Sequence, residues 1–146
     1  MTVPESSVHS IIIAEDDPDD RLMVRDALER CETRYVLRFA ENGADLLDML
    51  RHAGAFANTP LSPPPGLILL DLNMPKVTGL EALRAIKADV RLSAIPVVIW
   101  TTSQSAVERD ASYRDGAAQF LTKPDLFKEM ERALCEIAHT WLHRAP

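Results

Sequence analysis

The stretch Leu67-Ile68-Leu69-Leu70-Asp71-Leu72-Asn73-Met74-Pro75 decides the fold class of this 146-residue chain. Its aliphatic run lies between a Pro-Pro-Pro-Gly segment and a Met-Pro pair, a pattern that predicts a buried parallel strand over 67–71. Asp71 ends that strand, and open α/β sheets place their chemistry at the carboxyl ends of their strands. Asp71 is therefore the first candidate functional residue.

Apolar and amphipathic segments alternate on both sides of this strand. Further strands are predicted over 10–14, 35–40, 95–101 and 119–122. Helices are predicted to begin at Pro18, with Asp17 as N-cap, and after Asn42-Gly43, and to span 79–90, 103–114 and 125–142. Five strands alternating with five helices predict an α/β fold: a doubly wound, five-stranded parallel sheet with five helices on its two faces.

The length predicts a single domain over 1–146, because no repeat or second core is visible. Within it we expect a flexible start over 1–9, a Pro-rich loop insertion over 53–66 and a long C-terminal helix over 125–143. Helical spacing points Leu83, Ile86 and Val90 inward from the third helix. The apolar face of the last helix comprises Leu126, Met130, Ala133, Ile137 and Trp141.

Composition narrows the partners and the compartment. The net charge of −6 argues against a basic nucleic-acid-binding face. No apolar run approaches the ~18 residues of a membrane span, and the first ten residues lack the pattern of a signal peptide. Cys31 and Cys135 are interpreted as small buried hydrophobes, which favours the cytoplasm. The scattered histidines are interpreted as solvated and not as ligands: His9, His52, His139 and His143.

Carboxylates gather at two predicted strand ends. Glu15, Asp16 and Asp17 follow the first strand, and Asp71 ends the third, so parallel pairing would bring them to one edge of the sheet. Like charges so close raise one another's pKa, and a divalent cation would offset the repulsion. Oxygen ligands without nearby His or Cys favour Mg²⁺, which commonly accompanies phosphoryl chemistry. An Asp carboxylate can itself accept a phosphoryl group.

Two further strand ends carry groups that suit a phosphoryl group. Thr101 and Thr102 end the fourth strand with hydroxyls, and Lys123 follows the fifth with an ammonium group. Each feature alone has a structural explanation, such as a helix cap, a solvated turn, β-structure or a surface lysine. Their occurrence together, one at each of four strand ends, indicates a phosphoryl-accepting site.

The same segments carry a family resemblance. Residues 11–17, 69–75 with Thr78-Gly79, 96–101 and 116–124 resemble the receiver domain of two-component response regulators, in order and spacing and over essentially the whole chain. The resemblance implies a flavodoxin-like sheet of strand order 2-1-3-4-5 and a response regulator in a phosphorelay. It implies no enzymatic activity other than the protein's own phosphotransfer and dephosphorylation.

The resemblance also implies residue roles, all with Mg²⁺ as cofactor. Asp71 would be the phosphoacceptor. Glu15 and Asp16 would bind the metal with Asp71, and the backbone carbonyl of Asn73 would complete the protein ligands. Lys123 would be the phosphate partner. Thr101 would supply the switch hydroxyl, and Phe120 would be the switch aromatic residue.

Two positions depart from the family pattern. Thr78 stands where the family usually has Asp before the glycine. Thr102 stands where small residues are usual after the switch threonine, so its branched side chain would narrow phosphate access and slow transfer or hydrolysis.

A finer resemblance concerns the subgroup. The Pro-rich segment before the third strand, the run Thr101-Thr102-Ser103 and the ending around Phe120 resemble stand-alone regulators paired with bacterial phytochrome histidine kinases. The implied partner is a phytochrome-type sensor kinase, and the runner-up is another sensor kinase. Apolar positions of the last helix continue to Trp141-Leu142, and we expect a symmetric homodimer through this helix.

Three alternatives remain open at this point. A receiver that serves only as a docking module would share the fold without taking a phosphoryl group. A phosphohydrolase with an Asp nucleophile normally needs a second Asp two residues on, where this chain has Asn73. A nucleotide-binding domain needs a glycine-rich phosphate loop, and the five glycines are not clustered.

Overall fold

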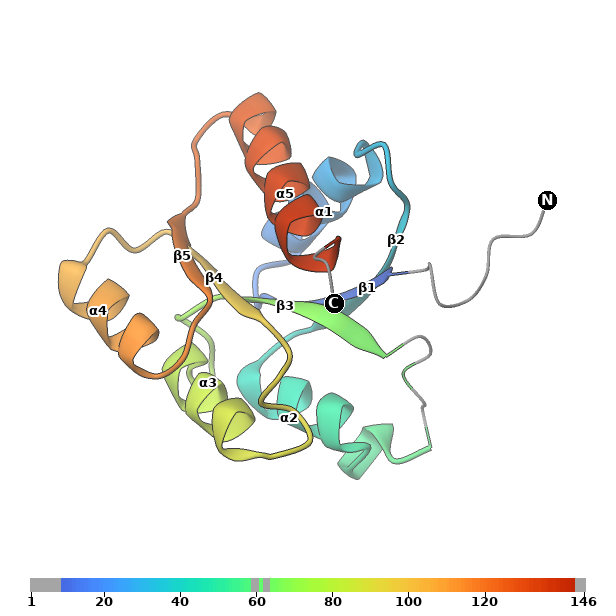
Figure 1. The fold of residues 1–146 in the computed structure, drawn as a ribbon, viewed down its shortest axis with the longest axis vertical. Helices are drawn as coiled ribbons and strands as arrows, with labels where there is room; N and C mark the ends of the chain where they lie inside the picture. The colour runs from blue at the N-terminus through green and yellow to red at the C-terminus, as the bar shows by residue number, and fades with distance from the viewer. Residues whose placement is uncertain (1–8, 59–60, 62–63, 144–146) are drawn as a thin grey trace.

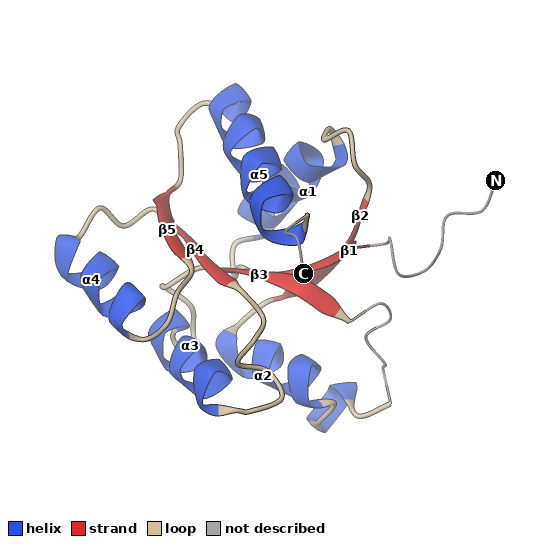
Figure 2. Cartoon of the chain, in the orientation of Figure 1, coloured by secondary structure: helices blue, strands red, loops and turns tan. Residues whose placement is uncertain are grey.

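The structure is a computed structural model that describes residues 9–58, 61 and 64–143. Five parallel strands form one sheet in the order β2-β1-β3-β4-β5. The strands are β1 (His9–Ala14), β2 (Tyr35–Ala40), β3 (Pro65–Leu70), β4 (Val97–Thr101) and β5 (Gln119–Thr122). The predicted fold class and strand order are therefore confirmed (Figures 1 and 2).

Helices cover both faces of the sheet. The helices are α1 (Pro18–Glu29), α2 (Gly43–Arg51), α3 (Gly79–Ala88), α4 (Ala106–Arg114) and α5 (Phe127–Leu142), with a short 3₁₀ helix, η2 (Gly54–Phe56). Figure 2 shows α1 and α5 on one face and α2 and α3 on the other. Two apolar clusters correspond to these faces, because alternate strand residues point to opposite sides.

Local caps fix several of the helix starts near the carboxyl edge of the sheet. The Asp17 side chain accepts from the backbone N–H groups of Asp19 and Asp20, as the N-cap prediction required. Thr78 forms a capping box with Glu81 at the start of α3, so the departure from the family's Asp leaves this helix capped. Gly79 cannot carry a side chain, because a Cβ there would collide with the Asp71 carbonyl oxygen.

Element ends differ from the predictions where caps intervene. The third helix ends at Ala88 with Asp89 as C-cap, so Val90 is 88% exposed and not inward. The last helix begins at Phe127, and Leu126 lies outside it with 63% exposure. The other predicted starts at 95 and 103 are also early, because α4 is capped by Ser105 and β4 pairs only from Val97.

The predicted loop over 53–66 is only partly a loop. It contains η2, and its last two residues already belong to β3, which ends at Leu70 and leaves Asp71 immediately after the strand. Residues 59–60 and 62–63 of this loop lie outside the described residues, as does most of the predicted flexible start.

The prediction for the two cysteines is wrong. Cys31 follows the end of α1 and Cys135 lies on α5, and the two form a disulfide with a Cα–Cα distance of 5.6 Å. The reason is that α1 and α5 pack side by side on the same face of the sheet (Figure 1). The inference of a cytoplasmic location from unpaired cysteines therefore loses its basis.

Candidate functional site

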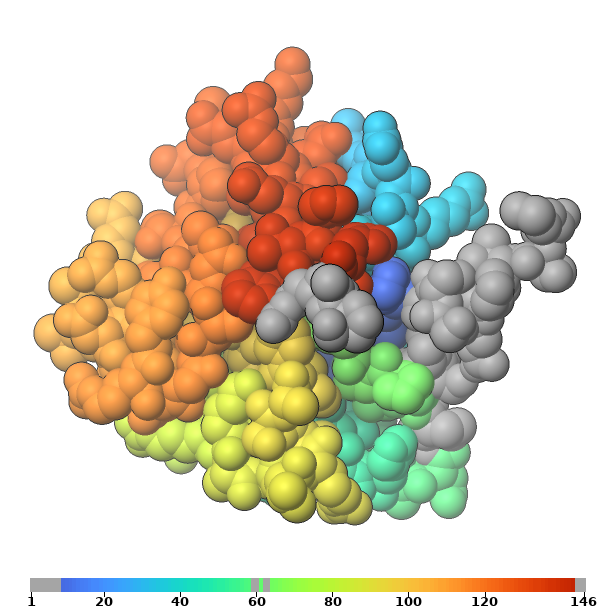
Figure 3. Space-filling model, in the orientation of Figure 1, coloured from blue at the N-terminus to red at the C-terminus, as the bar shows by residue number. Residues whose placement is uncertain are grey.

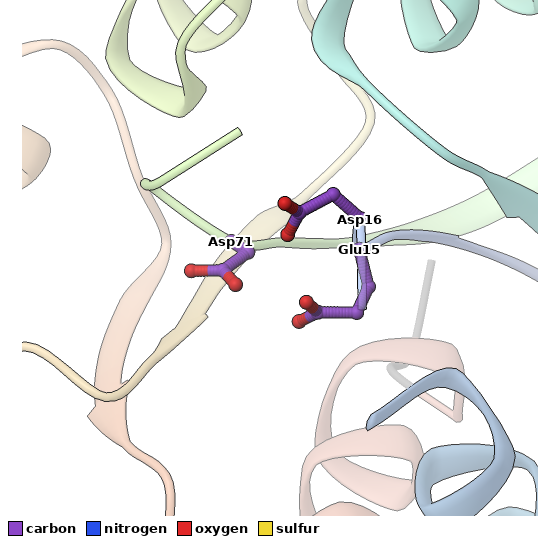
Figure 4. Close-up of side chains that lie close together, drawn as sticks. All are labelled: Glu15, Asp16 and Asp71. Atoms are coloured by element: carbon purple, nitrogen blue, oxygen red, sulfur yellow. The ribbon is translucent and has the colours of Figure 1, made fainter. Parts of the chain in front are cut away.

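Three carboxylates meet at the carboxyl edge of the sheet. Glu15 and Asp16 follow β1, and Asp71 follows the neighbouring β3. One ligand oxygen from each lies within 4.8 Å of the other two. Figure 4 shows the three side chains directed toward a shared space. Three of the four predicted carboxylates thus form a geometric cluster, whereas Asp17 caps α1 instead.

The cluster is held in place from several sides. Glu15 and Asp71 are buried, and Asp16 is exposed. One Asp71 carboxylate oxygen accepts from the Asn73 backbone N–H at 3.4 Å, and the Asp71 backbone N–H donates to the Ala14 carbonyl at 3.1 Å. The position of Asp71 is therefore fixed by the strand pairing and by its own loop.

Lys123 neutralises part of this charge. Its ammonium group lies 2.7 Å from Glu15, 3.1 Å from Asp20 and 3.4 Å from Asp71. Its backbone N–H donates to the Thr101 carbonyl, which extends the pairing of β4 and β5 past their ends. Lys123 is thus brought to Asp71 as expected, although Glu15 is its nearer partner.

Asp20 was not among the sequence-based candidates. It lies in the first turn of α1, whose N-cap Asp17 comes two residues after Glu15. The helix dipole alone explains an acidic residue in the first turn of a helix. The residue type of Asp20 therefore did not indicate a place in the functional site. Its contact with Lys123 joins positions 103 residues apart.

The pKa values reflect this crowding. Burial raises the pKa of Glu15 to about 8, and its hydrogen bond with Asp71 adds to the rise, while Lys123 opposes it. Burial lowers the pKa of Lys123, but the hydrogen bond to Glu15 and the nearby carboxylates of Asp71 and Glu15 raise it well above its usual value. Lys123 therefore stays charged, and the raised pKa of Glu15 means that a bound cation would compete with a proton at that carboxylate.

The donor set fits a hard divalent cation. All the side-chain ligands are carboxylate oxygens, and Asp16 is accessible to solvent. Mg²⁺ is bound through few carboxylates and keeps several waters, which suits a cluster that is open on one side.

The hydroxyls at the end of β4 differ in exposure. Thr101 is fully buried, and its hydroxyl oxygen accepts from the Ser103 backbone N–H at 3.2 Å. Thr102 is exposed. Phe120 on β5 is half-buried and packs against the apolar cluster beneath α2 and α3. In this structure the Thr101 hydroxyl is therefore engaged in its own loop.

The five-stranded sheet of order 2-1-3-4-5, with three carboxylates and a lysine at its carboxyl edge, defines a receiver domain. The response regulator receiver domain model matches residues 11–134. The chain belongs to this family.

The relatives by sequence include another response regulator. The chain is 35% identical to response regulator Rcp1 of Synechocystis sp. over 132 residues, 90% of this chain and 88% of Rcp1. It is also 35% identical to the probable methanogenesis regulatory protein FilR2 of Methanothrix harundinacea over 139 residues, 93% of this chain and 86% of FilR2.

Solved structures of the same fold include a phytochrome response regulator. The structure of the phosphorylated cyanobacterial phytochrome response regulator RcpA superposes with a TM-score of 0.86 and 31% identity, covering 95% of this chain and 97% of RcpA. The Mn²⁺-bound form of Rcp1 superposes with a TM-score of 0.83 and 33% identity, covering 94% and 97%. The expected likeness to phytochrome response regulators is confirmed.

Proposed function

We propose that this receiver domain accepts a phosphoryl group on Asp71 from a sensor histidine kinase and thereby changes the surface formed by α4, β5 and α5. The observation that carries the proposal is the cluster of Glu15, Asp16 and Asp71 with Lys123 at 3.4 Å from the Asp71 carboxylate. This arrangement combines a nucleophilic carboxylate, metal ligands and a cation at one edge.

The transfer step follows from these positions. An Asp71 carboxylate oxygen attacks the phosphorus of a phosphohistidine, the P–N bond breaks, and its electron pair returns to the leaving imidazole, which takes up a proton. The product on Asp71 is an acyl phosphate. Lys123 offsets charge on the phosphoryl oxygens, since its ammonium already faces the Asp71 carboxylate.

Mg²⁺ is the proposed cofactor. Glu15, Asp16 and Asp71 would hold it together with the Asn73 backbone carbonyl, and when bound it would offset the charge of the carboxylates and of the phosphoryl oxygens. The Mn²⁺-bound form of Rcp1 supports a divalent cation in a relative of this fold.

The proposed switch begins at Thr101. Its hydroxyl would leave the Ser103 backbone N–H and turn toward the phosphoryl group. Phe120 would then move into the space that Thr101 vacates. Because β5 and α4 pack together, this movement would alter their common surface.

The proposal is tested by mixing the wild-type protein with phosphoramidate, a small donor with a P–N bond, with Mg²⁺ or with EDTA. We expect intact-mass analysis to show a gain of one phosphoryl group that requires Mg²⁺. A protein that gains no mass under either condition, from phosphoramidate and from an autophosphorylated histidine kinase alike, would be a docking module and not a phosphoacceptor.

The Thr102 side chain is expected to slow loss of the phosphoryl group. It is exposed at the end of β4, next to Thr101, and its branched β-carbon would limit the approach of water. We expect Thr102→Ala to dephosphorylate a few-fold faster than wild type when the decay of the acyl phosphate is followed by mass, roughly 1 kcal/mol in barrier. Equal decay rates would reject this role.

We infer that the cognate kinase is of the phytochrome type, because proteins of the same fold include the phytochrome response regulator RcpA and the bacteriophytochrome response regulator AtBRR. FilR2 shows the same sequence identity as Rcp1, so another sensor kinase is the competing partner. A cytoplasmic location is part of the same proposal, since it follows from that partnership. No helix among the described residues is long and apolar enough to cross a membrane.

A symmetric homodimer through α5 and β5 is the expected assembly. Trp141 is half-buried and donates to Gln119 at 3.0 Å, so the exposed apolar end expected for this helix is not present. A groove of about 300 Å³ nevertheless runs between the two elements, lined in part by Leu121, Ala133 and Ile137.

Light scattering at micromolar concentration is expected to give the mass of two chains. Ala133→Glu would shift the mass toward one chain, because it places a charge in the groove. Val90→Glu, on an exposed residue after α3, is the matched control and should leave the mass unchanged. A wild-type monomer would contradict the dimer.

A further inference from the structure

Three of the four histidines gather at the amino edge of the sheet. His9 begins β1, and His139 and His143 lie one turn apart at the end of α5. The ring centroid of His143 lies 4.7 Å from that of His9 and 5.2 Å from that of His139. The prediction that the histidines are scattered is wrong for these three, because α5 ends beside the start of β1.

The packing of the last helical turn fixes this meeting. Leu142 is buried, and a Cβ added to Gly66 would lie 2.7 Å from its side chain. The same Cβ would lie 3.9 Å from the carbonyl oxygen of Ser10. Ser10 belongs to β1, which pairs with β3 at this point. Leu142 therefore anchors α5 against β3 beside β1 and holds His143 next to His9. Figure 1 shows the end of α5 at this edge of the sheet.

The cluster is open to solvent. His139 and His143 are exposed, and His9 is half-buried. Figure 3 shows the end of α5, in red, and the start of β1, in blue, at the surface of the molecule. Two of the three rings are therefore accessible to solvent, and the third is partly so.

The ring separations suit a shared metal ion. A Zn–N bond is about 2.0–2.1 Å long, so two imidazoles on one ion at right to tetrahedral angles have centroids about 4.4–5.2 Å apart. Both measured separations fall within this range. Among the described residues, only Glu15, Asp16 and Asp71 form a group of three whose ligand atoms already lie within 4.8 Å of one another. The ring nitrogens of the three histidines do not all lie this close together, so their side chains must rotate to point at one ion.

A neighbouring hydroxyl supplies the second contact that metal-binding imidazoles usually make. The Tyr35 hydroxyl lies 3.3 Å from Nε2 of His143. If Nε2 carries the proton and donates to Tyr35, Nδ1 is free to bind a cation.

We propose that His9, His139 and His143 bind a divalent transition-metal ion of the Zn²⁺ class. Imidazole nitrogens suit Zn²⁺, Ni²⁺ and Cu²⁺, whereas Mg²⁺ prefers oxygen ligands, so this site is chemically distinct from the acidic cluster. It is also distant, because β1 separates His9 from Glu15 by roughly 20 Å at ~3.3 Å per residue. The bound ion would tie the end of α5 to the start of β1.

The test is a Zn²⁺ titration in competition with a chromophoric chelator. Excess Mg²⁺ and the Asp71→Asn background keep Zn²⁺ from the acidic cluster, and the absence of reductant keeps Cys31 and Cys135 paired. We expect one ion per chain. His143→Ala and His139→Ala should each weaken binding by at least ~10-fold, as loss of a ligand or of its support does.

His52→Asn is the matched control. His52 ends α2 with a left-handed backbone, which Asn tolerates, and it lies outside the cluster. The affinity of the His52→Asn variant for Zn²⁺ should stay within about twofold of that of the Asp71→Asn parent protein. In the parent protein, Zn²⁺ should shift the imidazole NMR signals of His9, His139 and His143 and leave those of His52 in place.

Unchanged affinity in His143→Ala would overturn the proposal. So would one ion per two chains, which would indicate surface histidines bridging two molecules, or signals of the three histidines that do not move with added Zn²⁺.

Discussion

Asp71→Asn is expected to lower Mg²⁺-dependent phosphoryl uptake by at least ~10³-fold, a loss of the size seen when a nucleophile is removed. An amide cannot attack phosphorus as a carboxylate does, and the substitution also removes one of the three carboxylates proposed to bind the metal. The fold should persist, because Lys123 keeps Glu15 and Asp20 as partners and the Asn oxygen can still accept from Asn73. The measurement is intact-mass analysis after incubation with phosphoramidate.

Asp17→Asn is the matched control for this change. Asp17 is a neighbouring carboxylate that caps α1, and Asn caps about as well as Asp. We expect its uptake to equal that of wild type. The phosphoryl uptake of Asp16→Asn should lie between those of Asp71→Asn and Asp17→Asn, because the change weakens the proposed metal site and leaves the nucleophile in place. Full uptake by Asp71→Asn would place the phosphoryl group elsewhere.

Reduction of the disulfide is expected to lower the free energy of unfolding by about 2–5 kcal/mol. Cys31 and Cys135 are 104 residues apart, so their bond closes most of the chain into a loop and restricts the unfolded state. The bond also joins α1 to α5, the two helices on one face of the sheet. The measurement is urea unfolding with and without a reductant.

The double variant with Cys31→Ser and Cys135→Ser is the control. Its unfolding midpoint should not respond to reductant and should lie near that of the reduced wild type. Identical midpoints for oxidised and reduced wild type would contradict a stabilising bond. Thiol counting in freshly lysed cells would show which state the protein adopts in its own compartment, since reducing cytosol rarely sustains disulfides.

Sequence periodicity predicted the layers of this fold well. The aliphatic run before Asp71 and the alternation of strands and helices depend on local patterns, and the observed order of strands agrees. Element ends were less predictable, because a single cap decides them. Val90 continues a helical spacing, yet Asp89 ends the helix before it.

The candidate site was predictable because its residues stand at strand ends. Parallel pairing brings the carboxyl ends of β1 and β3 together, which places Glu15 and Asp16 beside Asp71. Contacts between side chains on separate helices or edges follow from packing, which periodicity does not encode. The disulfide, the contact of Asp20 with Lys123 and the meeting of His9 with His143 are all of this kind.

The most direct test of the account is borohydride trapping of the phosphorylated wild-type protein. Borohydride reduces the acyl phosphate of an aspartate to homoserine, and peptide mass spectrometry then identifies the position. We predict homoserine at position 71, formed only when Mg²⁺ is present during phosphorylation. Homoserine at another aspartate, or a phosphorylated protein that borohydride does not reduce, would contradict Asp71 as the phosphoacceptor.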